Sequence, residues 1–336
     1  MKNARLLRLT LLLTILLYAL PFGLTAQTVK KADDISFREM DSLFTWFRQN
    51  PPAADGANFT TRWAKTKAFD TYGFELSDKT WGDYHRYWKT DPLLAAAMEK
   101  SYPVLYYLNK AVEQSVADIV STKVTHGAVI WKLYNMGYIV KTKDACFALD
   151  LNQRGSEQLV DMLDFAVVSH IHGDHNNTIF LDAMVAAGKK VYTPFYKKGT
   201  LIDTTREFNF GGVNVRFTMN KQADVPVIVA QINCGPSANN YTIYHIGDSR
   251  TLEELNPTRH INLFILHIEN AINTGQSVAR VKPDVTIYDH VMELGHAVDK
   301  WRWSYQYTYN KIKGLDPAKS LILTWGERLE VGGYRL

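Results

Sequence analysis

Apolar side chains recur three or four positions apart over the first part of the chain, as in helices that bury one face. Two stretches show this spacing most clearly: Phe37, Met40, Phe44 and Phe47, and Leu105, Leu108, Val112, Val116 and Ile119. The first stretch stops at Pro51-Pro52, because proline does not continue a helix. The second predicts a helix over residues 103–120. We therefore expect residues 27–125 to form a helical N-terminal region.

From residue 126 onwards the pattern changes to short runs of β-branched, aromatic and other apolar residues, which favour strands. We expect strands over residues 128–134, 138–142, 146–150, 165–169, 213–219, 227–232, 241–246, 262–267, 285–288 and 321–325. Helical stretches near residues 177–187 and 297–313 lie between some of these runs. Strands interleaved with helices predict a layered α/β domain over residues 126–336.

The chain begins with a segment typical of a secretory signal peptide. Three basic residues among the first eight precede an apolar run over residues 9–20, and Ala26 offers a small residue at a cleavage site. The run is short for a transmembrane helix, which needs about 20 residues, although an uncleaved N-terminal anchor is the alternative. We expect no membrane span in the rest of the chain. Cleavage after Ala26 predicts a mature protein, residues 27–336, that is periplasmic or secreted.

Composition limits the classes of protein to which the chain can belong. It has 336 residues, of which 46% are hydrophobic and 21% charged, and this excludes collagen-like and low-complexity chains. Two cysteines do not make a disulfide scaffold. The net charge of +4 includes the three basic residues of the predicted signal peptide, so the mature chain is close to neutral. We therefore expect no nucleic-acid partner.

One motif concentrates residues that bind metal ions. His170-Ile171-His172-Gly173-Asp174-His175 directly follows the strand expected over residues 165–169. His170 and His172 are two positions apart, so on an extended backbone they point the same way. A turn at Gly173 then brings Asp174 and His175 to the same place. Imidazole and carboxylate groups together suit zinc, iron or manganese. Without a cation such a cluster is costly to bury, and a solvated polar loop is the alternative.

This motif and three other stretches resemble the metallo-β-lactamase-fold hydrolases, whose signature is His-x-His-x-Asp-His after a strand. Residues 127–150 resemble the opening strands of that family and end in its structural aspartate, Asp150. His245-Ile246-Gly247-Asp248 resembles its Gly-Asp element, and residues 282–290 resemble its closing strand, which delivers a last histidine. The resemblance covers residues 126–325 and implies an αββα sandwich with a helical N-terminal extension. Within the family, the pattern is most similar to the lactonase and phosphodiesterase-like branch.

The resemblance also implies which residues hold metal ions and which support them. The implied metal ligands are His170 and His172 for a first ion, Asp174 and His175 for a second, Asp248 as a bridge, and His290 as a last ligand of the second ion. His296 is an alternative last ligand or a substrate contact, but His290 is favoured because it directly ends a strand. His245 is expected to support Asp248 by a hydrogen bond. His267 also ends a strand and is a candidate for the pocket rim.

The first metal site departs from the family pattern. Members of the family usually supply another histidine ligand between His175 and the Gly-Asp element, but residues 176–244 contain no histidine. Cys234 follows the strand expected over residues 227–232, where this histidine would be expected, and a thiolate binds zinc well. Cys234 is therefore a candidate ligand, with a buried free cysteine as the alternative. Asn233 is a weaker candidate, and an incomplete first site is a third alternative.

The resemblance implies an exported metal-dependent hydrolase that acts on a small-molecule substrate. A pair of zinc ions, or of manganese or iron ions, would lower the pKa of a shared water and hold it as hydroxide. This hydroxide would attack an ester, a lactone or a phosphodiester, and Asp174 would bind metal and orient the nucleophile. Two alternatives stay open: a mononuclear iron oxidoreductase of the same fold, and a metal-binding member without catalytic activity. The oligomeric state does not follow from the sequence.

Overall fold

The computed structural model describes residues 34–52, 58–76, 82–298 and 300–335. All of them belong to one compact unit, residues 32–336. The predicted signal peptide, residues 1–26, lies outside the described residues. Among the helices that are described, none combines the length and the apolar character needed to cross a bilayer.

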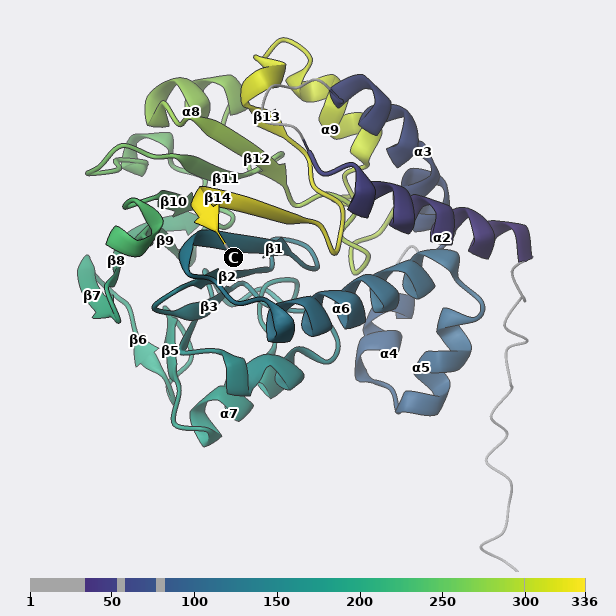
Figure 1. Cartoon of the computed structure of the whole chain (residues 1–336), viewed down its shortest axis with the longest axis horizontal. Coiled ribbons are helices and arrows are strands. Elements are labelled where there is room, and N and C mark those ends of the chain that lie inside the picture. Colours follow the sequence, from purple (N-terminus) through teal and green to yellow (C-terminus); the bar gives the residue numbers. More distant parts are fainter. Residues whose placement is uncertain (1–33, 53–57, 77–81, 299, 336) are drawn as a thin grey trace, which may run out of the picture. The chain divides into compact units, whose positions relative to one another are not determined.

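Helices make up the described part of the N-terminal region (Figure 1). They are α2 (Asp34–Gln49), α3 (Phe59–Glu75), α4 (Gly82–Lys89), α5 (Pro92–Glu99) and α6 (Pro103–Ser121). Two of their starts are marked in the sequence. Pro92 and Pro103 occupy first-turn positions of α5 and α6, where a missing N–H costs nothing, and the Asp91 carboxylate accepts hydrogen bonds from the first N–H groups of α5. The helix predicted over residues 103–120 is therefore confirmed as α6.

The rest of the chain builds two seven-stranded sheets. The first has, in spatial order, β14 (Arg328–Arg335), β1 (His126–Lys132), β2 (Tyr138–Thr142), β3 (Cys146–Leu149), β4 (Phe165–Val167), β5 (Lys190–Thr193) and β6 (Thr200–Leu201). The second has β13 (Ser320–Leu321), β12 (Val285–Asp289), β11 (Leu263–His267), β10 (Thr242–His245), β9 (Val225–Asn233), β8 (Val213–Gln222) and β7 (Arg206–Phe210). Strands β6, β7 and β14 escaped the sequence prediction because they are very short, exposed or at a sheet edge. Strand β5 also escaped it, although it lies inside the first sheet.

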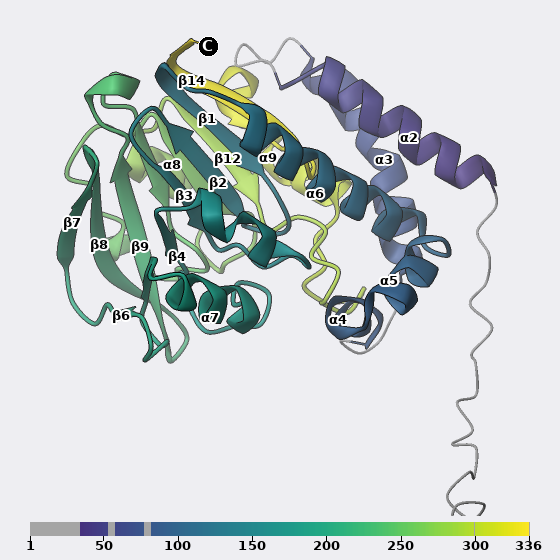
Figure 2. The ribbon, with the colours of Figure 1, turned by 60° about the horizontal axis from the view of Figure 1, so that its bottom comes forward.

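The two sheets face each other, and helices cover both outer faces (Figure 2). Neighbouring side chains of β1 show this arrangement, since Ile130 lies in the core between the sheets and Trp131 lies in the core outside the first sheet. That outer core is closed by α7 (Thr178–Ala186) and the end of α6. Helices α8 (Thr274–Val281) and α9 (Tyr305–Ile312) cover the second sheet. The predicted αββα sandwich with a helical N-terminal region is confirmed.

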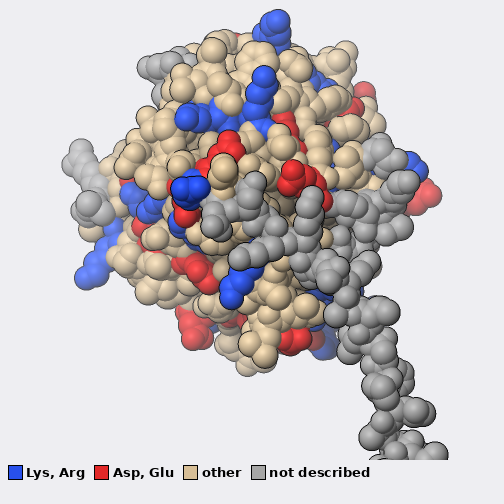
Figure 3. All heavy atoms as spheres, turned by 90° about the vertical axis from the view of Figure 1, so that its right-hand side faces the viewer, with Lys and Arg blue, Asp and Glu red and all other residues tan. Residues whose placement is uncertain are grey.

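The N-terminal helices share a core with the second helical layer. Phe69 of α3 packs edge-on against Trp325, with ring centroids 6.1 Å apart. A buried salt bridge of 2.5 Å joins Arg62 to Glu327. Asp70 accepts hydrogen bonds from the N–H groups of Tyr305 and Gln306 and so caps the start of α9. On the visible surface beside these helices, Lys and Arg side chains are interspersed with Asp and Glu (Figure 3).

Strand direction decides which side chains meet. In the first sheet, β3, β4 and β5 run parallel, and in the second sheet β10, β11 and β12 run parallel. The residues that follow these strands therefore gather at one edge of the sandwich, where α/β folds usually bind their ligands. β9 runs antiparallel to β10, with Asn233 opposite Thr242 and Ala230 opposite His245. The end of β9 therefore lies at the other edge.

Candidate metal centre

The loop after β4 carries the His-x-His-x-Asp-His motif and is held in place by backbone hydrogen bonds. The N–H of Ile228 in β9 donates to the carbonyl of Ser169 at 2.8 Å, which ties the loop to the second sheet. The N–H groups of His175 and Asn176 both donate to the carbonyl of His172, at 3.0 and 2.9 Å. This tight turn directs the motif side chains towards the ends of the strands of the second sheet.

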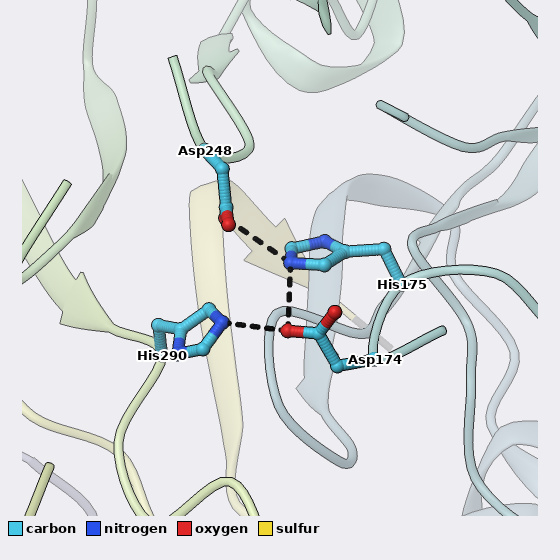
Figure 4. Close-up of side chains that lie close together, drawn as sticks. All are labelled: Asp174, His175, Asp248 and His290. Carbon is cyan, nitrogen blue, oxygen red and sulfur yellow. Dashed lines mark hydrogen bonds and ion pairs between the residues drawn. The ribbon is translucent and has the colours of Figure 1, made fainter. Parts of the chain in front are cut away.

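One cluster at this edge contains Asp174, His175, Asp248 and His290, all buried (Figure 4). Nε2 of His290 lies 2.9 Å from Oδ2 of Asp174, and Nε2 of His175 lies 3.5 Å from the same oxygen. Nε2 of His175 is also 3.1 Å from Oδ1 of Asp248. We call this group the carboxylate-rich cluster.

A second cluster contains His170, His172 and Asp248. Nε2 of His170 lies 3.1 Å from Nδ1 of His172 and 3.7 Å from Oδ2 of Asp248. His172 is partly exposed, whereas the other two residues are buried. We call this group the histidine cluster. Asp248 belongs to both clusters, and each of its two oxygens faces a different one.

The histidines and carboxylates of the carboxylate-rich cluster shift one another's pKa values. Burial opposes a positive charge on His175, but the carboxylates of Asp248, Asp174 and Asp150 outweigh it and raise the pKa of His175 well above its ordinary value. Burial favours protonation of Asp248, but His175 and the other histidines around it hold its pKa well below the usual range. In the histidine cluster, burial and the charge of His175 lower the pKa of His170 to about 4. Positive charge is therefore favoured at the carboxylate-rich cluster.

These donors fit a bound cation. Nε2 of His175 and Oδ1 of Asp248 are fully buried, and they have ion-pair contacts within the cluster, such as the 3.1 Å contact with each other, but no hydrogen bond with any described residue. Buried polar atoms are usually hydrogen-bonded, because one that is not costs about 1–3 kcal/mol. In each cluster the potential ligand atoms all lie within 4.8 Å of one another. Imidazole and carboxylate donors suit zinc, iron or manganese. The structure thus has a His/Asp centre that could hold a metal ion.

Asp150, which follows β3, holds His175 in position. Its Oδ1 accepts a hydrogen bond of 2.6 Å from the N–H of Ser169, and its Oδ2 lies 2.7 Å from Nδ1 of His175. The remaining nitrogen of His175 is thereby aimed at the cluster, as in many histidine ligands. His245 lies in the same buried layer, with its Nε2 3.7 Å from Asp150 and 3.4 Å from the carbonyl of Met136. The structure therefore places His245 beside Asp150, where the sequence predicted contact with Asp248.

Of the two candidates for the last ligand, His290 lies inside the carboxylate-rich cluster and His296 lies at its rim. Nε2 of His296 is 3.9 Å from Asp174, and its Nδ1 is 3.1 Å from Glu293. His290 has the left-handed conformation, with φ of 64°, and its N–H donates to Asp289. Both oxygens of the Asp289 carboxylate in turn accept hydrogen bonds from the ammonium group of buried Lys132, each 2.7 Å long. This buried pair links the first sheet to the strand that delivers His290.

His267 directs a ring nitrogen towards the centre. Its Nδ1 accepts a hydrogen bond of 2.8 Å from the N–H of Glu269, so the neutral ring carries its proton on Nε2. That nitrogen lies 3.8 Å from Oδ1 of Asp248, and the ring stacks on His290 with centroids 4.0 Å apart. Burial and the charge of His290 keep the pKa of His267 well below its ordinary value. His267 therefore presents a neutral N–H to the centre.

The structure does not bring Cys234 to either cluster. It follows β9 at the opposite edge, packs in the core between the sheets, and its thiol pKa is raised to about 12 by burial. Asn233 is also at that edge, where its side chain accepts a hydrogen bond from the N–H of Gly235. The prediction assumed that β9 ends at the site, whereas its antiparallel direction puts its beginning there.

Gln222, which the sequence analysis missed, reaches the centre instead. It lies at the turn between β8 and β9, and its Nε2 donates to Oδ2 of Asp248 at 2.8 Å. The hairpin of β8 and β9 was the feature of the sequence that could have indicated this position. Two long antiparallel strands joined by a short turn place the turn residues at the edge opposite to Asn233. A single glutamine in a turn has no distinctive chemistry in the sequence.

A cavity of about 200 Å³ lies beside the motif loop. Its walls come from α4, from the motif loop with the start of α7, and from the segments after β3 and β12: Tyr84, His85, Trp88, Lys89, Asn152, Gly173, Asn176, Thr178 and Glu293. Four of these residues, Tyr84, His85, Trp88 and Lys89, belong to α4, so the N-terminal region contributes to the surroundings of the centre.

Comparison with known proteins finds similar solved structures of low sequence identity. No protein-family model and no curated protein matches the chain. Among solved structures, it is similar to the metallo-β-lactamase-fold protein YhfI from Bacillus subtilis, with 13% identity over 61% of this chain and 99% of that chain and a TM-score of 0.48.

Two further solved structures are similar to this chain at a comparable level. A possible metal-dependent hydrolase from Veillonella parvula is 15% identical, over 61% of this chain and 100% of that chain, with a TM-score of 0.47. CmlA, a diiron β-hydroxylase from Streptomyces venezuelae, is 10% identical, over 61% of this chain and 54% of that chain, also with a TM-score of 0.47. The metal centre is inferred from the side chains described above and not from these likenesses.

Proposed function

We propose that the protein is an exported metal-dependent hydrolase with a two-ion centre. The observation that carries this proposal is the position of Asp248, whose Oδ1 faces His175 of one cluster while its Oδ2 faces His170 of the other. A carboxylate shared in this way is suited to bridging two cations. His170 and His172 would hold the first ion, Asp174, His175 and His290 the second, and Asp248 both.

Divalent cations at this centre, zinc or alternatively manganese or iron, would supply a Lewis acid and activate water. The chain's own groups then position the substrate and move protons. The Nε2–H of His267 is a neutral donor next to the centre and can stabilise negative charge that develops on a substrate oxygen. Asp174 orients the attacking water, and His296, paired with Glu293 at the rim, is placed to hand a proton to the leaving group.

The proposed substrate is a small ester, lactone or phosphodiester. The cavity between α4 and the motif loop is lined by aromatic rings, by neutral amide and hydroxyl groups, by His85 and by the oppositely charged Lys89 and Glu293. Such a lining suits a compact, partly apolar molecule with a polar group. Export follows from the signal peptide predicted over residues 1–26, and detection of a chain that starts at Gln27 outside the cytoplasm would test it.

The activity is tested with residues 27–336 purified without chelators. Turnover of p-nitrophenyl esters, a γ-lactone and bis-p-nitrophenyl phosphate is measured together with metal content. We expect Asp174→Ala to lose turnover and Asp182→Ala, on the exposed outer side of α7, to keep it. Full turnover in Asp174→Ala contradicts the proposal. A single iron per chain without hydrolysis would favour the oxidoreductase alternative, and absence of bound metal would favour a non-catalytic protein.

A further inference from the structure

The histidine cluster offers fewer ligands than the carboxylate-rich cluster. Its three residues supply two imidazole nitrogens and one oxygen of a shared carboxylate. Metal sites with fewer than four protein ligands keep open positions for water or substrate, and an additional protein donor tightens them. The polar side chain of Gln222 is directed at this cluster.

Gln222 is held close to Asp248 by the backbone around it. The N–H of Arg250 donates to the carbonyl of Lys221 at 2.9 Å, which ties the β8–β9 turn to the loop that carries Asp248. A second tie runs from Nδ2 of Asn220 to the carbonyl of Thr251, at 3.0 Å. The turn therefore sits firmly at the centre, and the amide of Gln222 lies 2.8 Å from the Asp248 oxygen that also faces His170.

The nitrogen and the oxygen of the Gln222 amide differ in their hydrogen bonding. The Nε2 group donates to Asp248, whereas Oε1 is buried and has no hydrogen-bond partner among the described residues. The nitrogen faces Asp248 because a carboxylate accepts hydrogen bonds. With a cation between Asp248 and His170, the oxygen becomes the favoured end, because it carries the lone pairs. A half-turn of the amide about its last side-chain bond exchanges the two ends and costs little.

We propose that Gln222 is a fourth ligand of the metal ion in the histidine cluster and binds it through Oε1. This inference rests on the proposed function, because it requires that His170, His172 and Asp248 hold an ion. The resulting donor set of two nitrogens and two oxygens is harder than a set with a third histidine. It therefore binds zinc less tightly than three histidines would and reduces the preference for zinc over manganese.

The test uses the metal-free protein, residues 27–336, titrated with Mn²⁺ and with Zn²⁺ against a chelator of known affinity. Three variants are compared with the wild type: Gln222→Leu, Gln222→His and the control Gln231→Leu, whose side chain is bonded to Thr258 away from the centre. Circular dichroism and the melting temperature of each metal-free variant establish that it folds. The Mn²⁺ electron paramagnetic resonance spectrum reports the ligands of the bound ion.

We expect Gln222→Leu to weaken Mn²⁺ binding at one of two sites by about 10-fold or more and to leave the other unchanged. Gln222→His should instead strengthen Zn²⁺ binding at that same site, and Gln231→Leu should behave as wild type. Wild-type affinities in both Gln222 variants overturn the ligand role. One bound ion in the wild type overturns it too but leaves a hydrolase with a single ion intact. Absence of any bound metal in the wild type overturns this inference and the proposed function together.

Discussion

The two halves of the candidate metal centre share Asp248 but are built differently. The carboxylate-rich cluster draws its residues from the motif loop and from the ends of two parallel strands, and all of them are buried. The histidine cluster takes His170 and His172 from one loop, and His172 is partly exposed. A fully buried site that also uses a residue after β12 is more preorganised, whereas a site with two of its three residues on one loop, one of them partly exposed, adjusts more easily. We therefore expect tight binding in the first case and weaker, exchangeable binding in the second.

The largest effect is expected from removing the group that the clusters share. Asp248→Ala deletes the carboxylate that faces both His175 and His170, so both ions should be lost and turnover should fall to background. Metal analysis after dialysis measures this, with Asp224→Ala in the exposed β8–β9 turn as the matched control. Retention of one ion at wild-type affinity would show that the clusters do not depend on a common carboxylate.

Single ligand variants should separate the halves. His290→Ala is expected to release the ion of the carboxylate-rich cluster and His172→Ala the ion of the histidine cluster, each with more than the about 10–100-fold loss of affinity typical of supporting residues. Because ligands stabilise the folded state, about 2.7 kcal/mol at a metal concentration 100 times Kd, the melting temperature in excess metal should fall more for His290→Ala. An equal fall in melting temperature in His290→Ala and His172→Ala would contradict tighter binding in the carboxylate-rich cluster.

The buried Lys132–Asp289 pair is expected to affect metal binding in the carboxylate-rich cluster only. Lys132→Met leaves Asp289 charged and buried without its cation, which costs about 3–5 kcal/mol of unfolding free energy. The same change should weaken metal binding in the carboxylate-rich cluster, because Asp289 fixes the backbone of His290. The double variant Lys132→Met/Asp289→Leu should recover much of the stability. Chemical denaturation measures the stability of the single and of the double variant. If Lys132→Met is as stable as wild type, the role of the pair is refuted.

A smaller effect is expected far from both clusters, at Asp70 of α3. Burial, only partly offset by the hydrogen bonds from Gln306 and Tyr305, raises the pKa of Asp70 to about 6 from an ordinary value of 3.8. The folded protein therefore holds this proton more tightly, and the carboxyl lowers stability as pH rises from about 4 to about 6. The free energy of unfolding of Asp70→Asn, measured relative to wild type, should therefore increase by roughly 2–3 kcal/mol when the pH is raised from 4 to 7.

The control for this prediction is metal stoichiometry, which Asp70→Asn should leave unchanged. Denaturation curves at pH 4, 5, 6 and 7 give the stability difference between the variant and the wild type. A difference that does not vary with pH would mean that Asp70 ionises normally in the folded protein. A changed stoichiometry would mean that the helical region acts on the clusters directly.

The parts of the centre that were predictable are those encoded by local sequence. The motif at residues 170–175 is a run of ligand-type side chains after a strand, and the structure brings all four of its ionisable residues to one edge. Most strands were predictable for the same reason, since hydrophobic periodicity is local. Asp248, His290 and the sandwich were implied by the resemblance to the metallo-β-lactamase-fold hydrolases, and both residues follow parallel strands that end at this edge.

The parts that were not predictable depend on strand direction and pairing. Cys234 was linked to the site by its place after a strand, but β9 runs the other way and carries it to the opposite edge. Gln222 arrives through the turn of the same hairpin, and nothing in its own neighbourhood in the sequence marks it. The contribution of α4 to the cavity depends on packing between segments far apart in the chain, which periodicity does not encode.

The shared carboxylate is tested most directly by electron paramagnetic resonance of the protein loaded with Mn²⁺. Two ions bridged by Asp248 would lie about 3.5–4 Å apart and give the spectrum of an exchange-coupled pair. We predict two Mn²⁺ per chain with this coupled spectrum, and its loss in Asp248→Ala. Two uncoupled ions, or one ion per chain at saturating Mn²⁺, would contradict a centre built around Asp248.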